Sequence, residues 1–248
     1  LSSFFSGTVV GYYSVSFRVF NVPLTLIGGA IGQVFLQRAA EAKVTGNLPL
    51  IVENAFRTLF MLGLFPAVLL TVAGKGLFTF VFGDPWAEAG VYVQMLGFWL
   101  IFRFVSSPLS TLFSVLEKQR AGLALNGVIF LTRLISLAIG GILGSARLAV
   151  LLFALSGAVV YGGLALWITR LAGVPWSHVK SIVLTGLKQS FLIAVPLFIA
   201  MLLQVSDLMQ VVLSGVLLLL YYSWIVQSDK AFRGLYFRLK DRLRLGNG

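Results

Sequence analysis

Long apolar segments, each bounded by charged residues, follow one another along almost the whole sequence. Since about 20 apolar residues cross a hydrocarbon core of ~30 Å, seven of these segments are candidate membrane spans. Lipid offers no hydrogen-bond partner to an open sheet edge, and the segments lack the alternation of a membrane barrel, so all of them are predicted to be helices. We therefore predict an all-α fold, a polytopic membrane helix bundle. The spans cover approximately residues 12 to 36, 58 to 82, 91 to 113, 122 to 143, 148 to 168, 190 to 206 and 208 to 226.

The composition narrows the chemistry that such a bundle can perform. Of the 248 residues 58% are hydrophobic and 11% are charged, whereas a soluble domain carries roughly 25% charged residues. The absence of cysteine and the presence of one histidine, His178, make a thiolate or histidine metal site and a Ser/His/Asp triad hard to assemble. The spans leave no length for a separate soluble catalytic domain. We predict a protein that is not an enzyme and needs no metal or cofactor.

The start of the sequence is atypical of a complete membrane protein. The first residue is Leu1 and not Met, and the opening LSSFF lacks the basic flank of a signal peptide. We expect the chain to be a piece of a longer protein, with Leu1 to Phe5 as the end of a truncated first helix.

Basic residues are concentrated in alternate connections between the spans. Fourteen of the 19 lysines and arginines fall on one side, and the opposite connections carry only Arg147. The positive-inside rule makes the side with fourteen cytoplasmic, so the C-terminus is predicted inside and the loop FGDPWAEAG outside. The basic tail is better explained by contact with anionic lipid than with nucleic acid, which we do not expect as a partner. The fourteen are Arg38, Lys43, Arg57, Lys118, Arg120, Arg170, Lys180, Lys188, Lys230, Arg233, Arg238, Lys240, Arg242 and Arg244.

Inside the spans the charged residues are cationic. All eight carboxylates fall outside the spans or at their ends, so this stretch offers no ion-coupling acid and no carboxylate pair for glycosyl chemistry. Arg103 and Arg133 lie near the middle of their spans, where an arginine costs a few kcal/mol and should face protein or a watery cavity. Arg18 and Lys75 lie nearer the outer ends, where snorkelling to headgroups explains them equally well.

Polar and small residues recur at helical spacing beside these arginines. Close packing explains Ser136, Gly140 and Gly144, which are four residues apart, and a structural hydrogen bond to a helix carbonyl is the alternative explanation for the arginines. The arginines and asparagines together favour a polar cavity that receives an anion, and guanidinium groups match phosphate geometry. One stripe is Ser14, Arg18, Asn21, Thr25, Gly28 and Gly32; a second is Gly122, Asn126, Arg133, Ser136, Gly140 and Gly144; a third is Arg103 with Ser106, Ser107 and Ser110.

Three stretches resemble a known family. They are VGYYSVSFRVFNVPLTLIGGAIGQVFLQRAAEA (residues 10 to 42), FGDPWAEAGVYVQMLG (82 to 97) and SPLSTLFSVLEKQRAGLALN (107 to 126). They are similar to the C-terminal half of bacterial oligosaccharide (O-antigen and polysaccharide) flippases of the multidrug/oligosaccharidyl-lipid/polysaccharide exporter superfamily. The resemblance covers roughly the first 170 residues.

The resemblance implies an inner-membrane transporter of two six-helix lobes around a central cavity. On this basis residues 1–169 are the C-terminal lobe, 170–189 a cytoplasmic loop, 190–226 an extra transmembrane helix pair and 227–248 a basic cytoplasmic tail. The implied activity is movement of an undecaprenyl-pyrophosphate-linked sugar unit to the periplasmic leaflet. The implied partners are membrane lipids, the anionic lipid-linked oligosaccharide and the missing N-terminal lobe. The substrate-binding candidates are Arg18, Asn21, Arg103, Asn126 and Arg133.

Other functions remain open at this point. A multidrug or small-solute antiporter of the same superfamily has the same pattern, although a cationic cavity suits organic cations poorly. A membrane-embedded enzyme of glycan assembly would need catalytic acids in the loops or in the missing part. A purely structural subunit is disfavoured because it would bear the insertion cost of the central arginines without using them.

Overall fold

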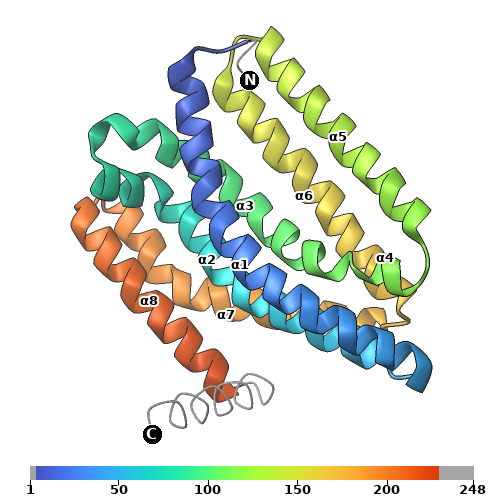
Figure 1. The fold of residues 1–248 in the computed structure, drawn as a ribbon. Helices are drawn as coiled ribbons and strands as arrows, with labels where there is room; N and C mark the ends of the chain where they lie inside the picture. Colours follow the sequence, from blue (N-terminus) through green and yellow to red (C-terminus); the bar gives the residue numbers. More distant parts are fainter. Residues whose placement is uncertain (1–3, 229–248) are drawn as a thin grey trace, which may run out of the picture.

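The computed structural model describes residues 4–228, and every long element in that range is a helix (Figure 1). The all-α prediction is confirmed. Each of the seven candidate spans corresponds to a helix that is long enough and apolar enough to cross a membrane. The chain is therefore a multi-pass membrane protein. The predicted basic tail, apart from its first two residues, lies outside the described residues. The elements are α1 (Gly7–Thr45), α2 (Leu48–Phe82), the 3-10 turn η1 (Asp84–Trp86), α3 (Ala87–Leu109), α4 (Leu112–Val115), α5 (Gln119–Ile142), α6 (Ala146–Leu171), α7 (Trp176–Leu202) and α8 (Asp207–Ser228).

The prediction of a loop over residues 170–189 is wrong. Helix α7 already begins at Trp176, directly after Pro175 in extended conformation. Val179, Ile182 and Gly186 form a buried stripe on its first turns, while the lysines beside them are exposed. The charged residues in this stretch led to the prediction of a loop. The apolar stripe of α7 instead packs against α2, which stabilises the helix.

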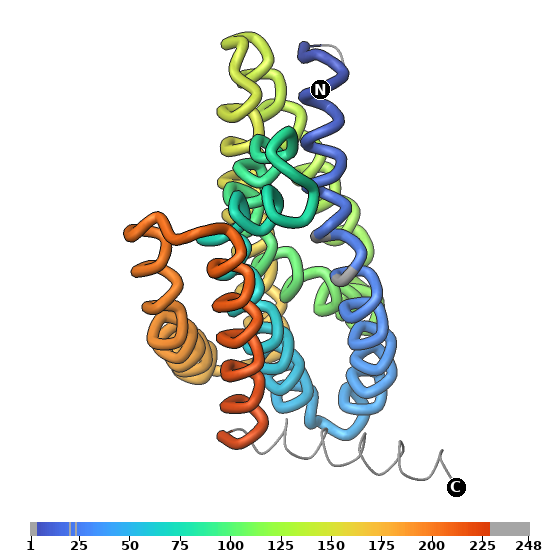
Figure 2. The backbone as a smooth tube through the Cα atoms, turned by 90° about the vertical axis from the view of Figure 1, so that its left-hand side faces the viewer, coloured from blue at the N-terminus to red at the C-terminus, as the bar shows by residue number. Residues whose placement is uncertain are grey.

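Helix α3 occupies the centre of the bundle. It packs against α1, α2 and α6, whereas α5 packs mainly on α6, and α7 and α8 pack on α2 and on each other. Figure 2 shows the α7–α8 pair on one side of the bundle and α1 on the other. Tyr92, Leu96 and Trp99 of α3 are fully buried, so this helix supplies the core around which the others are arranged.

Glycines permit the closest helix contacts. A Cβ on Gly140 of α5 would stand 2.3 Å from the Cα of Ala149 on α6. One turn before Gly140, Ser136 Oγ lies 2.9 Å from Ser156 Oγ on α6. The predicted small-residue packing is therefore confirmed for Ser136 and Gly140. It is wrong for Gly144, where a Cβ would have no neighbour within 4 Å among the described residues. With a φ of +66°, Gly144 instead turns the chain into α6.

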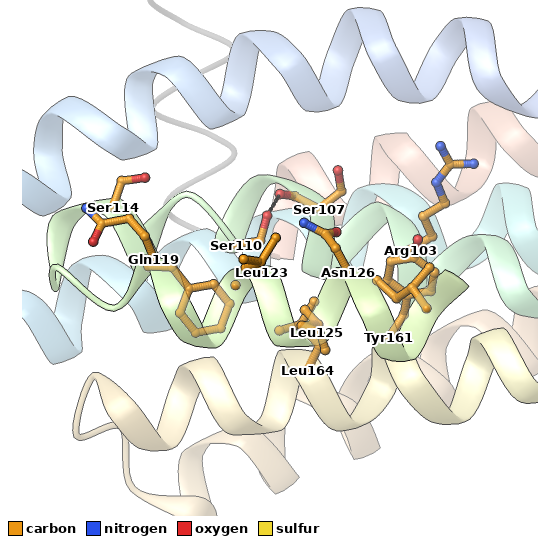
Figure 3. A pocket seen from close by; sticks show the side chains of 13 residues that line it. Arg103, Ser107, Ser110, Ser114, Gln119, Leu123, Leu125, Asn126, Tyr161 and Leu164 are labelled. Atoms are coloured by element: carbon orange, nitrogen blue, oxygen red, sulfur yellow. Dashed lines mark hydrogen bonds between the residues drawn. The ribbon is translucent and has the colours of Figure 1, made fainter. Parts of the chain in front are cut away.

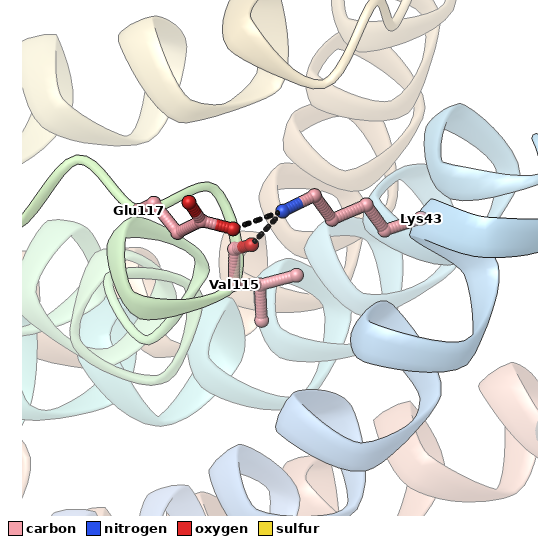
Figure 4. A network of polar contacts seen from close by, with 3 residues as sticks. All are labelled: Lys43, Val115 and Glu117. Carbon is pink, nitrogen blue, oxygen red and sulfur yellow. Dashed lines mark hydrogen bonds and ion pairs between the residues drawn. The ribbon is translucent and has the colours of Figure 1, made fainter.

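Polar contacts tie together the connections at one end of the bundle. Lys43, near the end of α1, donates to Glu117 Oε1 at 2.9 Å and to the Val115 carbonyl at 2.8 Å (Figure 4). His178 on α7 lies 2.8 Å from Glu53 on α2. The three connections predicted to share a side therefore lie at the same end of the bundle.

The opposite end is held by a bidentate ion pair. Arg147 at the start of α6 donates from Nε and Nη2 to the two carboxylate oxygens of Glu88 at the start of α3, at 2.8 and 2.6 Å. This pair joins two of the connections that were predicted to face outward.

Candidate functional site

A polar cavity of about 480 Å³ lies between α3, α4, α5 and α6. Arg103 marks one end of it, and Ser114 and Gln119 mark the other (Figure 3). Arg103 is half-buried, whereas Ser107, Ser114, Gln119 and Asn126 are exposed, so the cavity is open along much of its length. The lining residues are Arg103, Ser107, Ser110, Phe113, Ser114, Gln119, Gly122, Leu123, Leu125, Asn126, Ile129, Tyr161 and Leu164.

Arg103 is held in place by one hydrogen bond and two aromatic rings. Its Nη2 donates to Asn21 Oδ1 on α1 at 3.1 Å. Its Cζ lies 5.0 Å from the centroid of the Trp99 ring and 5.4 Å from that of Phe17, which is cation–π distance. Within residues 4–228 this is the one hydrogen bond that it makes, so most of its five N–H donors are available to a ligand.

Arg133 is anchored differently. Its Nη2 donates to the hydroxyl of Tyr161 at 2.9 Å, and its Cζ lies 5.3 Å from the centroid of the Phe153 ring. Tyr161 lines the cavity and Arg133 does not. Arg133 therefore contributes to the wall indirectly, by orienting the Tyr161 hydroxyl.

One aromatic cluster, formed by Phe17, Trp99, Phe153 and Tyr161, supports both guanidinium groups. Trp99 stacks on Phe17 and meets Phe153 and Tyr161 edge-on, with ring centroids 5.4 to 6.1 Å apart. A Cβ on Gly157 would stand 2.5 Å from Trp99 Nε1, so the glycine makes room for the indole. Among the described residues no carboxylate pairs with either arginine, and the cluster fixes both through ring contacts.

The remaining wall of the cavity is uncharged, and hydrogen-bonding side chains share it with apolar ones such as Leu123 and Leu164. Ser107, Ser110 and Ser114 continue the face of Arg103 toward the α4–α5 connection, and Asn126 and Gln119 of α5 face them (Figure 3). Ser110 Oγ donates to the Ser107 carbonyl at 2.6 Å. The cavity thus combines one permanent cation with hydroxyl and amide groups, a set that can bind phosphate at one end and sugar hydroxyls along the wall.

The five predicted site residues do not all meet in this cavity. Arg103 and Asn126 line it, and Asn21 reaches it through its bond to Arg103. Arg133 acts through Tyr161. Arg18 is exposed on α1 and does not line the cavity.

Several lining residues were missed by the sequence reasoning. Ser114 continues the series Arg103, Ser107 and Ser110 at helical steps of three and four, so the pattern contained that signal. Tyr161 lies in an apolar span with no polar stripe around it, and nothing in the sequence places it beside an arginine 28 positions earlier.

Among the comparisons with known proteins, the structural one identifies the fold. No known protein family matches the chain, and no curated protein matches it. A solved structure described as "Lipid II flippase MurJ, inward closed conformation" has the same fold with a TM-score of 0.67 and 15% sequence identity. The match covers 88% of this chain and 47% of the solved chain, so the chain spans about half the length of that flippase. This likeness establishes that the chain has a flippase-like helix-bundle fold.

Proposed function

We propose that this chain is one lobe of a transporter that flips an anionic lipid-linked oligosaccharide across the bacterial inner membrane. The observation that carries the proposal is Arg103, which lines one end of a polar cavity inside a flippase-like bundle. The described lining of that cavity contains no carboxylate. A diphosphate group linked to a lipid and a sugar presents the charge and the hydroxyls that this lining complements. Undecaprenyl-pyrophosphate-linked sugar, of the O-antigen or polysaccharide type, is the proposed substrate.

The proposed roles follow from the contacts. Arg103 binds the phosphate, and Asn21 and the aromatic cluster orient its guanidinium group. Asn126 binds sugar hydroxyls, while Arg133 orients Tyr161. Arg18 is exposed on α1, and we assign it to the half of the cavity that a second lobe would complete.

The proposed organisation is that of a two-lobe transporter working by alternating access. Helices α1 to α6 form the C-terminal lobe, and α7 and α8 are the extra pair. The C-terminus is cytoplasmic and the connection at residues 84–88 is periplasmic. A reporter fused after residue 248 should therefore report cytoplasm, and one inserted at residues 84–88 should report periplasm; finding both on one side would overturn this topology.

The deciding experiment is a flipping assay on the full-length protein in proteoliposomes, with a fluorescent polyprenyl-pyrophosphate oligosaccharide. The wild type should move the probe between leaflets, and Arg103→Ala should move it on the order of 10- to 100-fold more slowly. Arg170→Ala, which removes an exposed arginine at the end of α6, is the matched control and should behave like the wild type. Transport of small organic cations without flipping would instead support the antiporter alternative.

A further inference from the structure

A second polar cavity, of about 570 Å³, lies in the seam between the lobe and the α7–α8 pair. It is bounded by the C-terminal turns of α2, by η1 and α3, and by the turn from α7 into α8. Figure 1 shows the α2–α3 and α7–α8 connections close together at the left of the bundle. The cavity is separate from the one that contains Arg103. Its polar lining includes Lys75, Thr79, Asp84, Gln94, Asp207 and Gln210.

The cavity is built by a close approach of α8 to α2. A Cβ on Gly76 would stand 2.5 Å from Gln210 Oε1 and 3.2 Å from Asp207 Oδ1, so the glycine leaves room for these two side chains. The two glutamine amides are fixed by their donors: Gln94 Nε2 bonds the Val72 carbonyl at 2.8 Å, and Gln210 Nε2 bonds the Val205 carbonyl at 3.1 Å. Their amide oxygens are left as acceptors.

Three charged side chains in this cavity have no hydrogen-bond or ion-pair partner among the described residues. They belong to Lys75, Asp84 and Asp207. Glu88 and Arg147, at the same end of the bundle, pair in bidentate fashion. The cavity therefore presents one ammonium and two carboxylates to whatever enters it. Asp207 also begins α8, where an acid favours the helix N-terminus, and the charge of Lys75 acts on Glu88 without an ion-pair contact.

We place this cavity at the depth of lipid headgroups. Helix α2 ends at Phe82 and α8 begins at Asp207, and the ends of membrane-spanning helices lie near the membrane boundary. Lys75 lies seven residues before the end of α2, roughly 10 Å at 1.5 Å per residue, which a lysine side chain can bridge by snorkelling. Met201, Leu202 and Leu203 beside the rim are 50 to 81% exposed and offer an apolar surface to acyl chains.

We propose that this cavity binds the headgroup of a zwitterionic phospholipid with a primary amine, as in phosphatidylethanolamine. The lipid phosphate meets Lys75, and its ammonium group meets Asp84, Asp207 and the glutamine oxygens. A primary ammonium has three N–H donors for these acceptors, whereas the quaternary ammonium of phosphatidylcholine has none. Phosphatidylglycerol could place its phosphate against Lys75 in the same way, but its glycerol headgroup brings no cation to the two carboxylates. A lipid in this seam joins the α7–α8 pair to the lobe, and its binding does not depend on transport.

Lipid retention by the full-length protein tests the proposal. Protein in nanodiscs of equal parts phosphatidylethanolamine, phosphatidylcholine and phosphatidylglycerol is released in the mass spectrometer, and the retained lipids are counted. The wild type should retain phosphatidylethanolamine about tenfold over either competitor, as expected when charge-assisted hydrogen bonds are made by one lipid alone. Lys75→Gln should lower this retention severalfold, and Asp84→Asn with Asp207→Asn should abolish the preference over phosphatidylglycerol.

The control variant is Lys180→Gln, which removes an exposed lysine at the other end of α7. It should retain lipid like the wild type. Thr79→Val adds a second probe, because it removes only one hydroxyl from the lining, and it should reduce retention less than Lys75→Gln. Equal retention of the three lipids by the wild type, or unchanged preference in both charge variants, would overturn the proposal. Unchanged circular dichroism in the variants shows that they are folded.

Discussion

Helices α3 and α5 each carry an arginine near the middle of a membrane span, yet the two helices have opposite surroundings. In its most apolar stretch the span that contains α3 is 67% buried, while α5 is 6% buried. Helix α3 is enclosed by α1, α2 and α6, whereas α5 leans on α6 and leaves residues such as Phe130 and Leu134 exposed. The difference separates the two arginines. Arg103 comes from the enclosed helix and faces the cavity, and Arg133 comes from the outer helix and reaches inward to the Tyr161 hydroxyl.

A position near the middle of a membrane span therefore does not by itself determine what an arginine does. A guanidinium with free donors in a cavity can bind an anion directly, and one that is occupied by a neighbouring hydroxyl orients that neighbour. Both are stabilised by the same aromatic cluster, which lowers the cost of placing two cations in one bundle.

The strongest loss of function is expected when the chain is expressed without a second lobe to cover the exposed face of α5 and complete the cavity. The 248-residue chain, expressed alone in cells that lack their native flippase, should give no surface polysaccharide, because alternating access needs a second lobe. Co-expression with an N-terminal lobe should restore it. Restoration by the chain alone would mean that two copies assemble or that the two-lobe proposal is wrong.

Arg103→Ala should produce the next strongest loss. Removing charge-assisted hydrogen bonds to a phosphate costs about 1.5–3 kcal/mol each, so initial flipping rates should fall on the order of 10- to 100-fold. Arg103→Lys should recover only part of the loss because the bidentate geometry is absent. Membrane abundance, measured by immunoblot, should stay near normal; a parallel fall in abundance would show that Arg103 is structural.

Arg133→Ala should have a smaller effect that Tyr161→Phe reproduces. If Arg133 acts by orienting the Tyr161 hydroxyl, the double variant should be no worse than either single variant in the flipping assay. Arg133→Lys should retain part of the activity, since an ammonium can still donate to that hydroxyl. Additive losses in the double variant would instead indicate that Arg133 contacts the substrate itself.

Glycine substitutions should separate the enclosed helix from the outer one by stability. A Cβ on Gly97 of α3 would stand 2.9 Å from the Thr71 backbone nitrogen on α2, and overpacking of this kind costs about 1–3 kcal/mol. A Cβ on Gly127 of α5 would meet nothing within 4 Å in the described part of the chain, so Gly127→Ala should change stability by less than about 0.5 kcal/mol. Thermal unfolding in detergent measures both. Equal shifts would contradict the contrast between the two helices.

The weakest effect is expected at the Lys43–Glu117 pair, which joins α1 to the α4–α5 connection (Figure 4). The hydrogen bond and charge of Lys43 lower the pKa of Glu117. The pair is therefore formed above the ordinary glutamate pKa and is lost as the pH falls through the lowered value. Both side chains are well exposed, so the change in melting temperature should be slight. Glu117→Gln should remove this decrease in melting temperature at acid pH. If the melting temperature of the variant depends on pH as that of the wild type does, another group is responsible.

Much of the transmembrane architecture was predictable because lipid acts on each segment separately. Apolar length alone identifies the spans, since every backbone group in hydrocarbon must be satisfied within its own helix. Charged residues between the spans then indicated which connections share a side, and the contacts of Lys43 and His178 gather these at one end. The same reasoning failed for residues 170–189, because charged residues on one face of a helix resemble a loop when the partner of the buried face is not known.

An all-helical membrane chain with arginines but no acids inside its spans follows from the sequence alone, since span length and residue type are local properties. The choice of which arginine faces the cavity was made by the tertiary structure. The partners of Arg103 and Arg133 come from other helices, with Asn21 of α1 82 positions away and Tyr161 of α6 28 positions away. Such pairings depend on how helices cross, which no periodicity within one helix records. The same is true of the seam between α2 and α8, where Gly76 admits the first turn of a helix from the far end of the chain.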